Sequence, residues 1–441
     1  MNSSTSSRTS QAGAAGERSG KRIVLTTFGS LGDLHPYMAI ALGLQARGHQ
    51  TVLATSGMYR QKVEEAGLGF HGVRPHFEGD LDIKNLIRRG MELKSGPEYI
   101  IRELVIKPIR DSYADLDAVA KECDLLVTHP LTFAGPLIAE KRGIPWISTA
   151  LQPMVFFSAY DPSVLAPAQW LSRFRGLGPG FYRFMFDLAR RHVRNWSDPI
   201  RRLRAEIGLP PSDADPLFEG QHSPKCVLAL FSKVLAPPQP DWPPQTLVTG
   251  FPFYDRRDDR IGMDPELSAF LDAGPPPIVF TLGSAAVMDA GDFYAVSARA
   301  AQKLGQRAVL LIGPDKDNLP KMPLPPEIAV FEYAPYSEIF PRAAAIVHQG
   351  GVGTTAQALR AGRPMVIMPY SHDQPDNADR VARLGCGKVI ARTRYTAERA
   401  EEALRSLLED TRMAARAEEI GRQVQSEDGM GTACDAIEAL L

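Results

Sequence analysis

The sequence predicts an α/β protein with two doubly wound, Rossmann-like domains that face each other across a cleft. The chain has 441 residues, about three times the length of a typical single domain, which favours two large domains. Short β-branched runs alternate with helical stretches in both halves, a pattern typical of parallel sheets. The second half also opens like the first, because IVFTLGS at residues 278–284 repeats IVLTTFGS at residues 23–30 with one residue fewer.

The first half begins with a strand, a glycine-rich loop and a helix. Residues 22–27 are the strand, FGSLGDLHP at residues 28–36 is the loop, and residues 37–47 carry apolar groups at helical spacing. Gly48 ends this helix and residues 51–55 start the next strand, which completes a βαβ unit. Further strands are expected at residues 124–128 and 145–149, around an alanine-rich helix at residues 134–141.

The remaining boundaries follow from changes in composition. Residues 154–211 are aromatic, basic and helical in pattern, so we expect a helical insertion within an N-terminal domain of residues 21–249. Prolines cluster between residues 236 and 277, which places the inter-domain linker near residues 250–274. The C-terminal domain, residues 275–441, then supplies strands at residues 308–312, 329–331, 344–348 and 365–368 and ends in charged helices.

Composition excludes several classes of protein. The chain is 44% hydrophobic and 23% charged, as in ordinary globular proteins, and its net charge of −1 provides no field to hold nucleic acid. Residues 1–20 lack the apolar core of a secretory signal and are expected to be a disordered tail. The four cysteines lie 48 or more residues apart, so no short metal-binding spacing exists, and a reducing, cytoplasmic setting is expected.

One glycine-rich segment, HQGGVGTTAQ at residues 348–357, lies between a buried strand and a helix. Its glycines let the backbone approach a ligand, and the helix start near residues 353–355 offers free N–H groups and a positive dipole end to phosphate oxygens. His348, at the end of the strand, can donate an imidazole N–H to the same phosphates. A glycine-rich turn needed only for packing is the alternative interpretation.

A polar cluster follows the strand at residues 365–368, in the segment PYSHDQPDNA at residues 369–378. Asp373 and Gln374 are expected at the same sheet edge as His348, where a carboxylate beside an amide suits adjacent sugar hydroxyls. The alternative is that Asp373 or Asn377 caps the following helix, a role that we assign to Asn377.

These segments together resemble the donor-binding signature of family 1 glycosyltransferases, which have the GT-B fold. The resemblance covers nearly the whole ordered chain and rests on YAPYSEIF (333–340), HQGGVGT (348–354), AGRP (361–364) and HDQ (372–374). The chain is most similar to the bacterial branch that includes rhamnolipid-type rhamnosyltransferases and flavonoid or sterol glycosyltransferases. This similarity rests on GSLGD (29–33) with Pro36, HSP (222–224), APPQPDW (236–242) and TGFP (249–252).

The resemblance implies an acceptor site in the N-terminal domain and a nucleotide-sugar donor site in the C-terminal domain. It implies that the diphosphate is contacted by His348, Gly351, Gly353 and Thr354, with Ser284 reaching toward the phosphates, and that the sugar is held by Asp373 and Gln374. Tyr333 stands where plant members have a Trp that stacks on the base. The plant ribose-binding Glu corresponds to Ala356 here, and the neighbouring Gln357 is a candidate replacement.

Sugar transfer needs a base, because an alcohol or phenol that attacks the anomeric carbon must lose a proton. Plant members use a His between the loop Gly and a Pro, and Asp33 stands at that place here. His129 falls near the position of the plant Asp that orients this His, so a pair of Asp33 and His129 with exchanged residue types is expected. His35 is a further candidate, and a helix N-cap is the alternative role of Asp33.

Aromatic residues are frequent between residues 156 and 186, with arginines interleaved. We expect part of this segment, including Phe156 and Phe157, to line an apolar acceptor pocket. Ordinary core packing is one alternative, and contact with anionic lipid headgroups is another, less favoured one.

Together with the resemblance, the sequence predicts an inverting glycosyltransferase. It would transfer a hexose or deoxyhexose from a UDP- or dTDP-sugar to a hydroxyl of a hydrophobic small molecule or lipid, of flavonoid, sterol, macrolide or hydroxyacyl type. Neither a cofactor nor a metal is expected, because His348 and helix N–H groups can meet the diphosphate charge. The alternatives are a nucleotide-sugar epimerase or hydrolase on the same fold, and a non-catalytic nucleotide-sugar-binding partner subunit.

Overall fold

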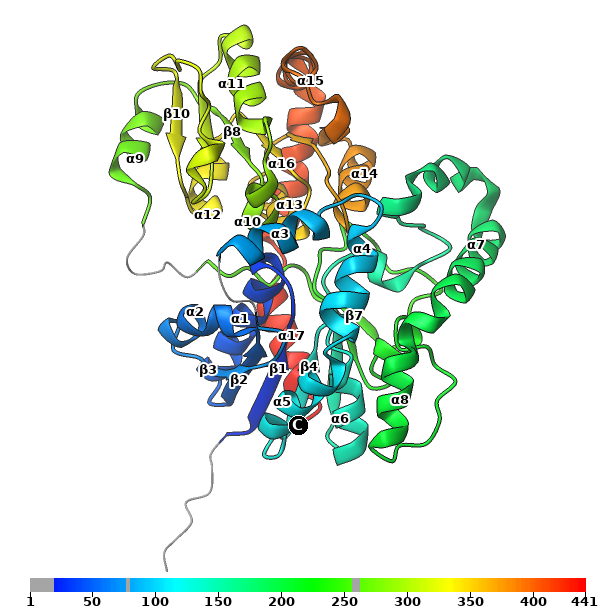
Figure 1. The fold of residues 1–441 in the computed structure, drawn as a ribbon. Coiled ribbons are helices and arrows are strands. Elements are labelled where there is room, and N and C mark those ends of the chain that lie inside the picture. Colours follow the sequence, from blue (N-terminus) through cyan, green and yellow to red (C-terminus); the bar gives the residue numbers. More distant parts are fainter. Residues whose placement is uncertain (1–19, 77–79, 256–261) are drawn as a thin grey trace, which may run out of the picture.

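The computed structural model describes residues 20–76, 80–255 and 262–441, and it has two lobes, each built on a parallel sheet (Figure 1). The lower lobe in this view contains a seven-stranded sheet in the order β3-β2-β1-β4-β5-β6-β7. The upper lobe contains a six-stranded sheet in the order β10-β9-β8-β11-β12-β13. Helices cover both faces of each sheet, so the two-domain α/β fold predicted from the sequence is confirmed.

The strands of both sheets are short and mostly buried, which explains why they appear in the sequence as continuous apolar runs rather than as alternating patterns. In the N-terminal lobe they are β1 (Arg22–Thr26), β2 (Gln50–Thr55), β3 (Gly69–Gly72), β4 (Leu125–Thr128), β5 (Trp146–Ala150), β6 (Val227–Ala229) and β7 (Thr246–Val248). In the C-terminal lobe they are β8 (Ile278–Thr281), β9 (Ala308–Leu311), β10 (Ile328–Phe331), β11 (Ala345–His348), β12 (Met365–Ile367) and β13 (Gly387–Val389).

The helices alternate with the strands, as parallel sheets require. Those of the first half are α1 (Leu31–Ala46), α2 (Arg60–Glu65), α3 (Asp80–Gly90), α4 (Gly96–Tyr99), α5 (Ile109–Ala120), α6 (Ala134–Arg142), α7 (Gly178–Val193) and α8 (Asp198–Glu206). Those of the second half are α9 (Pro265–Asp272), α10 (Gly283–Ala286), α11 (Phe293–Leu304), α12 (Tyr336–Ile339), α13 (Val352–Arg360), α14 (Gln374–Leu384), α15 (Ala397–Glu409), α16 (Thr411–Gln425) and α17 (Gly429–Glu438).

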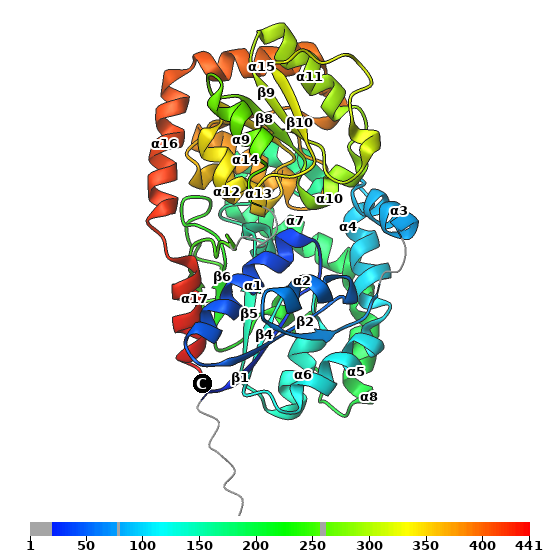
Figure 2. The ribbon, with the colours of Figure 1, turned by 90° about the vertical axis from the view of Figure 1, so that its left-hand side faces the viewer.

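The last helix, α17, lies in a different lobe from the one that the predicted domain boundary assigns to it. Helix α16 runs down one side of the molecule from the upper lobe, and α17 packs against α1 in the lower lobe (Figure 2). Cys434 and Ile437 of α17 are fully buried in the core that surrounds β1. Arg47 at the end of α1 also pairs with Asp435 and Glu438, each at 2.6 Å. The end of the predicted C-terminal domain therefore belongs to the N-terminal lobe, because its apolar face is buried there.

The predicted linker, residues 250–274, ends in a helix that belongs to the C-terminal lobe. Leu267 and Leu271 of α9 are buried in the core of that lobe, so the connection between the lobes is shorter than predicted. Residues 256–261 of this linker, and residues 1–19 of the predicted tail, lie outside the described residues.

The predicted insertion between β5 and β6 is helical. It consists of two 3-10 segments, Pro153–Phe156 and Ala166–Leu177, followed by α7, a third 3-10 segment, Arg194–Ser197, and α8. Within the part of the chain that the structure describes, no helix has both the length and the apolar character needed to cross a membrane.

Candidate active site

Helix α1 begins at the carboxyl end of β1, where the two lobes meet. Ser30 is its N-cap, and Oδ2 of Asp33 accepts the Ser30 N–H at 2.7 Å in a capping box. A Cβ added at Gly29, whose φ is +138°, would lie 2.2 Å from the Asp33 carboxylate, so only glycine leaves room for this arrangement. The proposed N-cap role of Asp33 is wrong, because the helix begins at Leu31 and not near Pro36.

Strand β4 lies next to β1 and brings His129 against Asp33. Nε2 of His129 lies 3.3 Å from Oδ1 of Asp33, while Nδ1 accepts the Leu131 N–H at 3.0 Å. Because Nδ1 is an acceptor, the neutral ring carries its proton on Nε2, as assigned from these hydrogen bonds, and donates it to Asp33. The Asp33 side chain is 28% exposed and the His129 side chain only 4%, so Asp33 is the member of the pair that a substrate can reach.

His35 lies outside this pair. It is two residues after Asp33 on α1, a spacing that places the two side chains on different sides of a helix, and its ring stacks on Tyr254 with centroids 5.1 Å apart. Tyr59, which the sequence did not indicate, donates its hydroxyl to the Gly29 carbonyl at 2.9 Å and so helps to hold the loop.

The glycine-rich segment forms the start of α13, opposite the start of α1. The Val352 N–H is donated to Oδ2 of Asp373 at 3.1 Å, whereas the N–H groups of Gly353 and Thr354 make no hydrogen bond to another described residue. A Cβ at Gly353 would lie 3.7 Å from the Cα of Gly32 in α1, so the two helix starts face each other. Unused N–H groups at the N-terminus of α13 favour a bound anion.

Helix α10 adds a third helix start at this junction, since it packs beside α1 (Figure 2). Gly283 and Gly351 flank the Gln349 side chain, and a Cβ at either glycine would lie within 2.8 Å of its amide nitrogen. Ser284 in the first turn of α10 is exposed. Within the described residues, no group of three or more His, Cys, Asp or Glu side chains is placed to hold a metal ion.

His348 does not face the junction. Its side chain is fully buried, its Nδ1 accepts the Gly350 N–H at 3.0 Å, and its Nε2 lies 3.3 Å from Sδ of Met365. Burial lowers the pKa of His348 to about 3, so the ring is neutral. The structure therefore contradicts the prediction that this imidazole donates to phosphate, because both ring nitrogens are used inside the lobe.

Asp373 and Gln374 lie at the start of α14, beside the start of α13. Oδ2 of Asp373 also accepts from Nδ2 of Asn377 at 2.7 Å, and Gln374 Oε1 accepts the Tyr370 N–H at 2.8 Å. Burial raises the pKa of Asp373 to about 7, and the nearby Asp33 carboxylate adds to this shift. The cap position of α14 is Asp373, so the assignment of Asn377 as the cap is wrong; Asn377 lies inside the helix.

Three further positions of the predicted donor site are Tyr333, Ala356 and Gln357. Tyr333 follows β10 and is 57% exposed. Ala356 is buried in α13. Gln357 contacts Asp255 at 3.4 Å and Arg360 at 2.8 Å, and it lines a hollow of about 490 Å³ beside the linker.

Of the two phenylalanines predicted to line an acceptor pocket, Phe156 packs in the interior and Phe157 is half-buried. Phe156 is 8% exposed and stacks on Trp242 with ring centroids 4.3 Å apart. Phe157, half-buried with a φ of +46°, packs edge-on against Phe186 and Phe218. For Phe156 the structure favours core packing over an acceptor wall, because another ring covers its face.

Two segments of the N-terminal half cross to the C-terminal half near the site. The first joins α3 and the loop after it to the upper lobe. The Ser371 hydroxyl donates to the Glu92 carbonyl at 3.0 Å, and Nζ of Lys84 lies 2.8 Å from Oδ2 of Asp315. The loop after α3 therefore lies beside Ser371, which precedes Asp373 by two residues.

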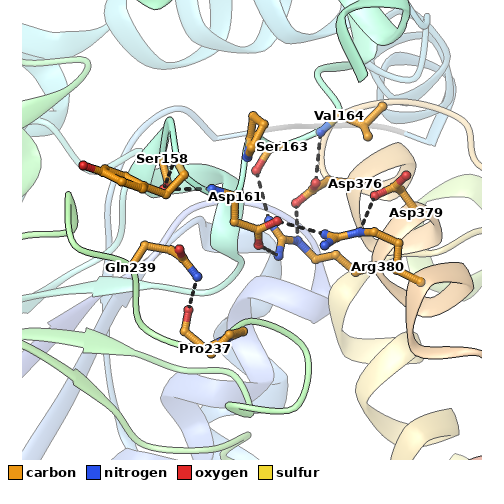
Figure 3. A network of polar contacts seen from close by, with 12 residues as sticks. Ser158, Asp161, Ser163, Val164, Pro237, Gln239, Asp376, Asp379 and Arg380 are labelled. Atoms are coloured by element: carbon orange, nitrogen blue, oxygen red, sulfur yellow. Dashed lines mark hydrogen bonds and ion pairs between the residues drawn. The ribbon is translucent and has the colours of Figure 1, made fainter. Parts of the chain in front are cut away.

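The second crossing is a buried network of charges between the insertion and α14 (Figure 3). Arg380 is 2% exposed; its Nε donates to Asp376 at 2.8 Å, and its guanidinium also pairs with Asp161 of the insertion. Arg175 pairs with Asp379 at 2.7 Å. The sequence could not show the two pairs that join the insertion to α14, because their partners lie more than 200 residues apart and form no local motif.

Comparisons with known proteins agree with this arrangement. Residues 23–158 match the model of the glycosyltransferase family 28 N-terminal domain, and residues 303–435 match the C-terminal domain of erythromycin biosynthesis protein CIII-like proteins. The chain is 33% identical over 427 residues to the O-mycaminosyltylonolide 6-deoxyallosyltransferase of Streptomyces fradiae, covering 95% of this chain and 97% of that protein. The chain belongs to the family 1 glycosyltransferases of GT-B fold.

This glycosyltransferase is also similar to larger proteins and to solved structures. It is 29% identical over 432 residues to the sterol 3-beta-glucosyltransferase of Emericella nidulans, covering 94% of this chain but only 30% of that protein. The crystal structure of the glycosyltransferase of kitacinnamycin covers 96% of this chain and 99% of its own, with a TM-score of 0.70 at 22% identity. That of the calicheamicin glycosyltransferase CalG4 has the same TM-score at 18% identity, covering 96% and 98%.

Proposed function

We propose that this glycosyltransferase transfers a hexose or deoxyhexose from a UDP- or dTDP-sugar to a hydroxyl of a hydrophobic small molecule or lipid, with inversion at the anomeric carbon. The acceptor class is supported by two relatives, whose names describe transfer to O-mycaminosyltylonolide and to a sterol. The observation that carries the proposal is the Asp33–His129 pair, which lies where the starts of α1 and α13 meet.

In the proposed reaction Asp33 is the base. The acceptor oxygen attacks the anomeric carbon from the side opposite the diphosphate and gives its proton to the Asp33 carboxylate. The bond between this carbon and the phosphate oxygen breaks, and its electron pair remains on the diphosphate. His129 keeps the carboxylate in place through its Nε2–H and is a positioning residue.

The diphosphate charge would be met by backbone groups. The N–H groups of Gly353 and Thr354, with the Ser284 hydroxyl, can stabilise the charge that develops on the leaving group. Asp373 and Gln374 would hold the sugar hydroxyls, and Tyr333 would stack on the base. These groups require no metal or cofactor for the proposed reaction. We also propose that the reaction takes place in the cytoplasm, since all four cysteines are free thiols.

The test is product analysis with labelled UDP- and dTDP-sugars and a panel of phenolic, sterol and hydroxyacyl acceptors. We expect a glycoside with inverted anomeric configuration from the wild type and far less of it from Asp33→Asn. Free sugar or an epimer without glycoside would indicate a hydrolase or epimerase, and binding without turnover would indicate a partner subunit. Either result would contradict the proposal.

A further inference from the structure

The outer side of the helical insertion carries a concentration of exposed apolar side chains. Of fourteen large hydrophobic residues exposed in the described part of the chain, six lie between residues 160 and 188. They are Tyr160, Trp170, Phe174, Leu177, Phe184 and Leu188, and each is 42–65% exposed. Such a concentration is unusual for a surface that meets only water.

Most of these side chains form one continuous surface. The rings of Trp170, Phe174 and Phe181 are in contact, with successive centroids 6.0 and 5.8 Å apart. Leu177 lies just before α7, and Phe181, Phe184 and Leu188 follow along α7 at spacings of three and four residues, which places these three on one side of the helix. We call this surface the apolar stripe; it comprises Trp170, Phe174, Leu177, Phe181, Phe184 and Leu188.

The charge around the apolar stripe is positive. Residues 160–194 contain six arginines and no lysine, against two aspartates and no glutamate. Arg173, Arg191 and Arg194 are exposed and form no ion pair with another described residue. Arg191 follows Leu188 by three residues, so it extends the apolar stripe by one helical turn.

The insertion is fixed on its other side. Asp161 and Arg175 tie it to α14 through the buried network with Arg380 and Asp379 (Figure 3). Helix α7 lies at the outer edge of the molecule, beyond α14 (Figure 1). The apolar stripe is therefore held in a fixed position relative to α14, the helix that begins directly after Asp373.

We propose that the apolar stripe binds the surface of an anionic lipid membrane. A helix with aromatic and leucine side chains on one face and arginines beside them matches a membrane interface, where the rings enter the headgroup region and the guanidinium groups meet lipid phosphates. The excess of arginine favours lipid phosphates over a second copy of this chain, since two copies of a positive surface repel each other. The enzyme would then transfer the sugar at the membrane, in which hydrophobic acceptors dissolve. Only this last point rests on the proposed function.

The test is flotation of the full chain with vesicles of phosphatidylcholine alone and of phosphatidylcholine with phosphatidylglycerol. We expect wild type to bind the anionic vesicles, and at least about tenfold weaker binding from Phe184→Ser/Leu188→Ser. Arg173→Gln and Arg191→Gln should each weaken binding about fivefold. Matched controls are Leu319→Ser and Arg299→Gln, which change exposed residues of the C-terminal lobe and should bind like wild type.

Three results would overturn the proposal. They are equal binding of wild type to both vesicle types, unchanged binding of the Phe184→Ser/Leu188→Ser variant, and a dimer in solution that this variant converts to a monomer. Turnover of a water-soluble phenol should be unchanged in all these variants. Vesicle binding needs neither donor nor acceptor, so its failure is distinguishable from failure of the proposed sugar transfer.

Discussion

The two lobes place a histidine at equivalent positions, at the end of the strand next to the first strand of each sheet. His129 follows β4 beside β1, and His348 ends β11 beside β8. In each ring Nδ1 accepts the backbone N–H two residues further on, so both rings carry their proton on Nε2. Nε2 of His129 lies 3.3 Å from the Asp33 carboxylate, whereas Nε2 of His348 lies 3.3 Å from the sulfur of Met365.

The lobes also differ after the Gly-Ser that follows the first strand of each. Three residues after Ser30 stands Asp33, and three residues after Ser284 stands Val287, which is buried. The shared fold thus provides the same histidine geometry twice, and only the N-terminal lobe adds the carboxylate. Equivalent backbone positions do not imply equivalent chemistry, so we expect substitutions in the two lobes to change different kinetic quantities.

The largest effect is expected from Asp33→Asn. This change removes the base but keeps an oxygen that can accept the Ser30 N–H. Turnover should fall by about 10²–10⁴, while donor affinity stays the same and the free energy of unfolding changes by about 1 kcal/mol or less. Steady-state kinetics and denaturant unfolding measure these quantities.

The matched control for Asp33→Asn is Asp264→Asn. Asp264 is the N-cap of α9 and accepts the Glu266 N–H at 2.7 Å, so this variant tests capping alone. It should turn over like wild type. A near-normal rate in Asp33→Asn would remove the residue from catalysis and make His129 the next candidate.

The pair His129→Asn and His348→Asn tests the comparison directly, because an Asn oxygen can accept the same N–H as Nδ1 does. His129→Asn removes the N–H that is donated to Asp33, so turnover should fall about 10- to 100-fold. This loss is smaller than the factor of about 10²–10⁴ expected when the base itself is removed. His348→Asn should cost about 1–3 kcal/mol of unfolding free energy through lost packing, with donor KM nearly unchanged. A large rise in donor KM in His348→Asn would show that this ring contacts the diphosphate after all.

In the C-terminal lobe, Tyr333→Ala should weaken donor binding by about 1–3 kcal/mol, if stacking on the base resembles stacking in nucleic-acid complexes. Acceptor affinity and turnover at saturating donor should barely change, because the ring is exposed after β10 and is not part of the Asp33–His129 pair. Titration of the nucleotide diphosphate by calorimetry measures the effect. An unchanged dissociation constant would exclude Tyr333 from the donor site.

Ionisation of Asp373 should make the stability of the protein depend on pH. The pKa of Asp373 is raised to about 7, so between about pH 4 and pH 7 the folded protein binds more protons than the unfolded chain. The free energy of unfolding of the wild type therefore decreases as pH rises through this range. In Asp373→Asn the contribution of this carboxylate to that decrease should be absent. Denaturant unfolding at several pH values checks it. A stability difference between the two proteins that does not vary with pH would mean that Asp373 ionises normally.

Much of the fold is visible in the sequence, because strands such as β1, β8 and β11 are continuous apolar runs. Strands β3, β6, β7 and β13 were not predicted, since three or four residues carry little pattern, as in GFHG at residues 69–72. The destination of α17 could not be predicted either, because an apolar helix face does not specify the lobe that buries it.

Some residues of the site were placed correctly from the sequence and others were not. The proximity of Asp33 and His129 was expected from the resemblance to the plant members, and the structure brings them together. The direction of the His348 ring depends on a hydrogen bond to Gly350 and on burial, neither of which a motif shows. Arg380 was missed because its partner Asp161 is distant in the sequence.

The central claim is that Asp33, and not a histidine, removes the proton of the acceptor. The most direct test compares the rate loss caused by Asp33→Asn for an aliphatic alcohol and for an acidic phenol, each at saturating donor. A phenol that ionises easily needs less help from a base, so the loss should be at least about tenfold larger for the alcohol. Equal losses for the two acceptors would contradict the account, because they would mean that Asp33 shapes the site without accepting the proton.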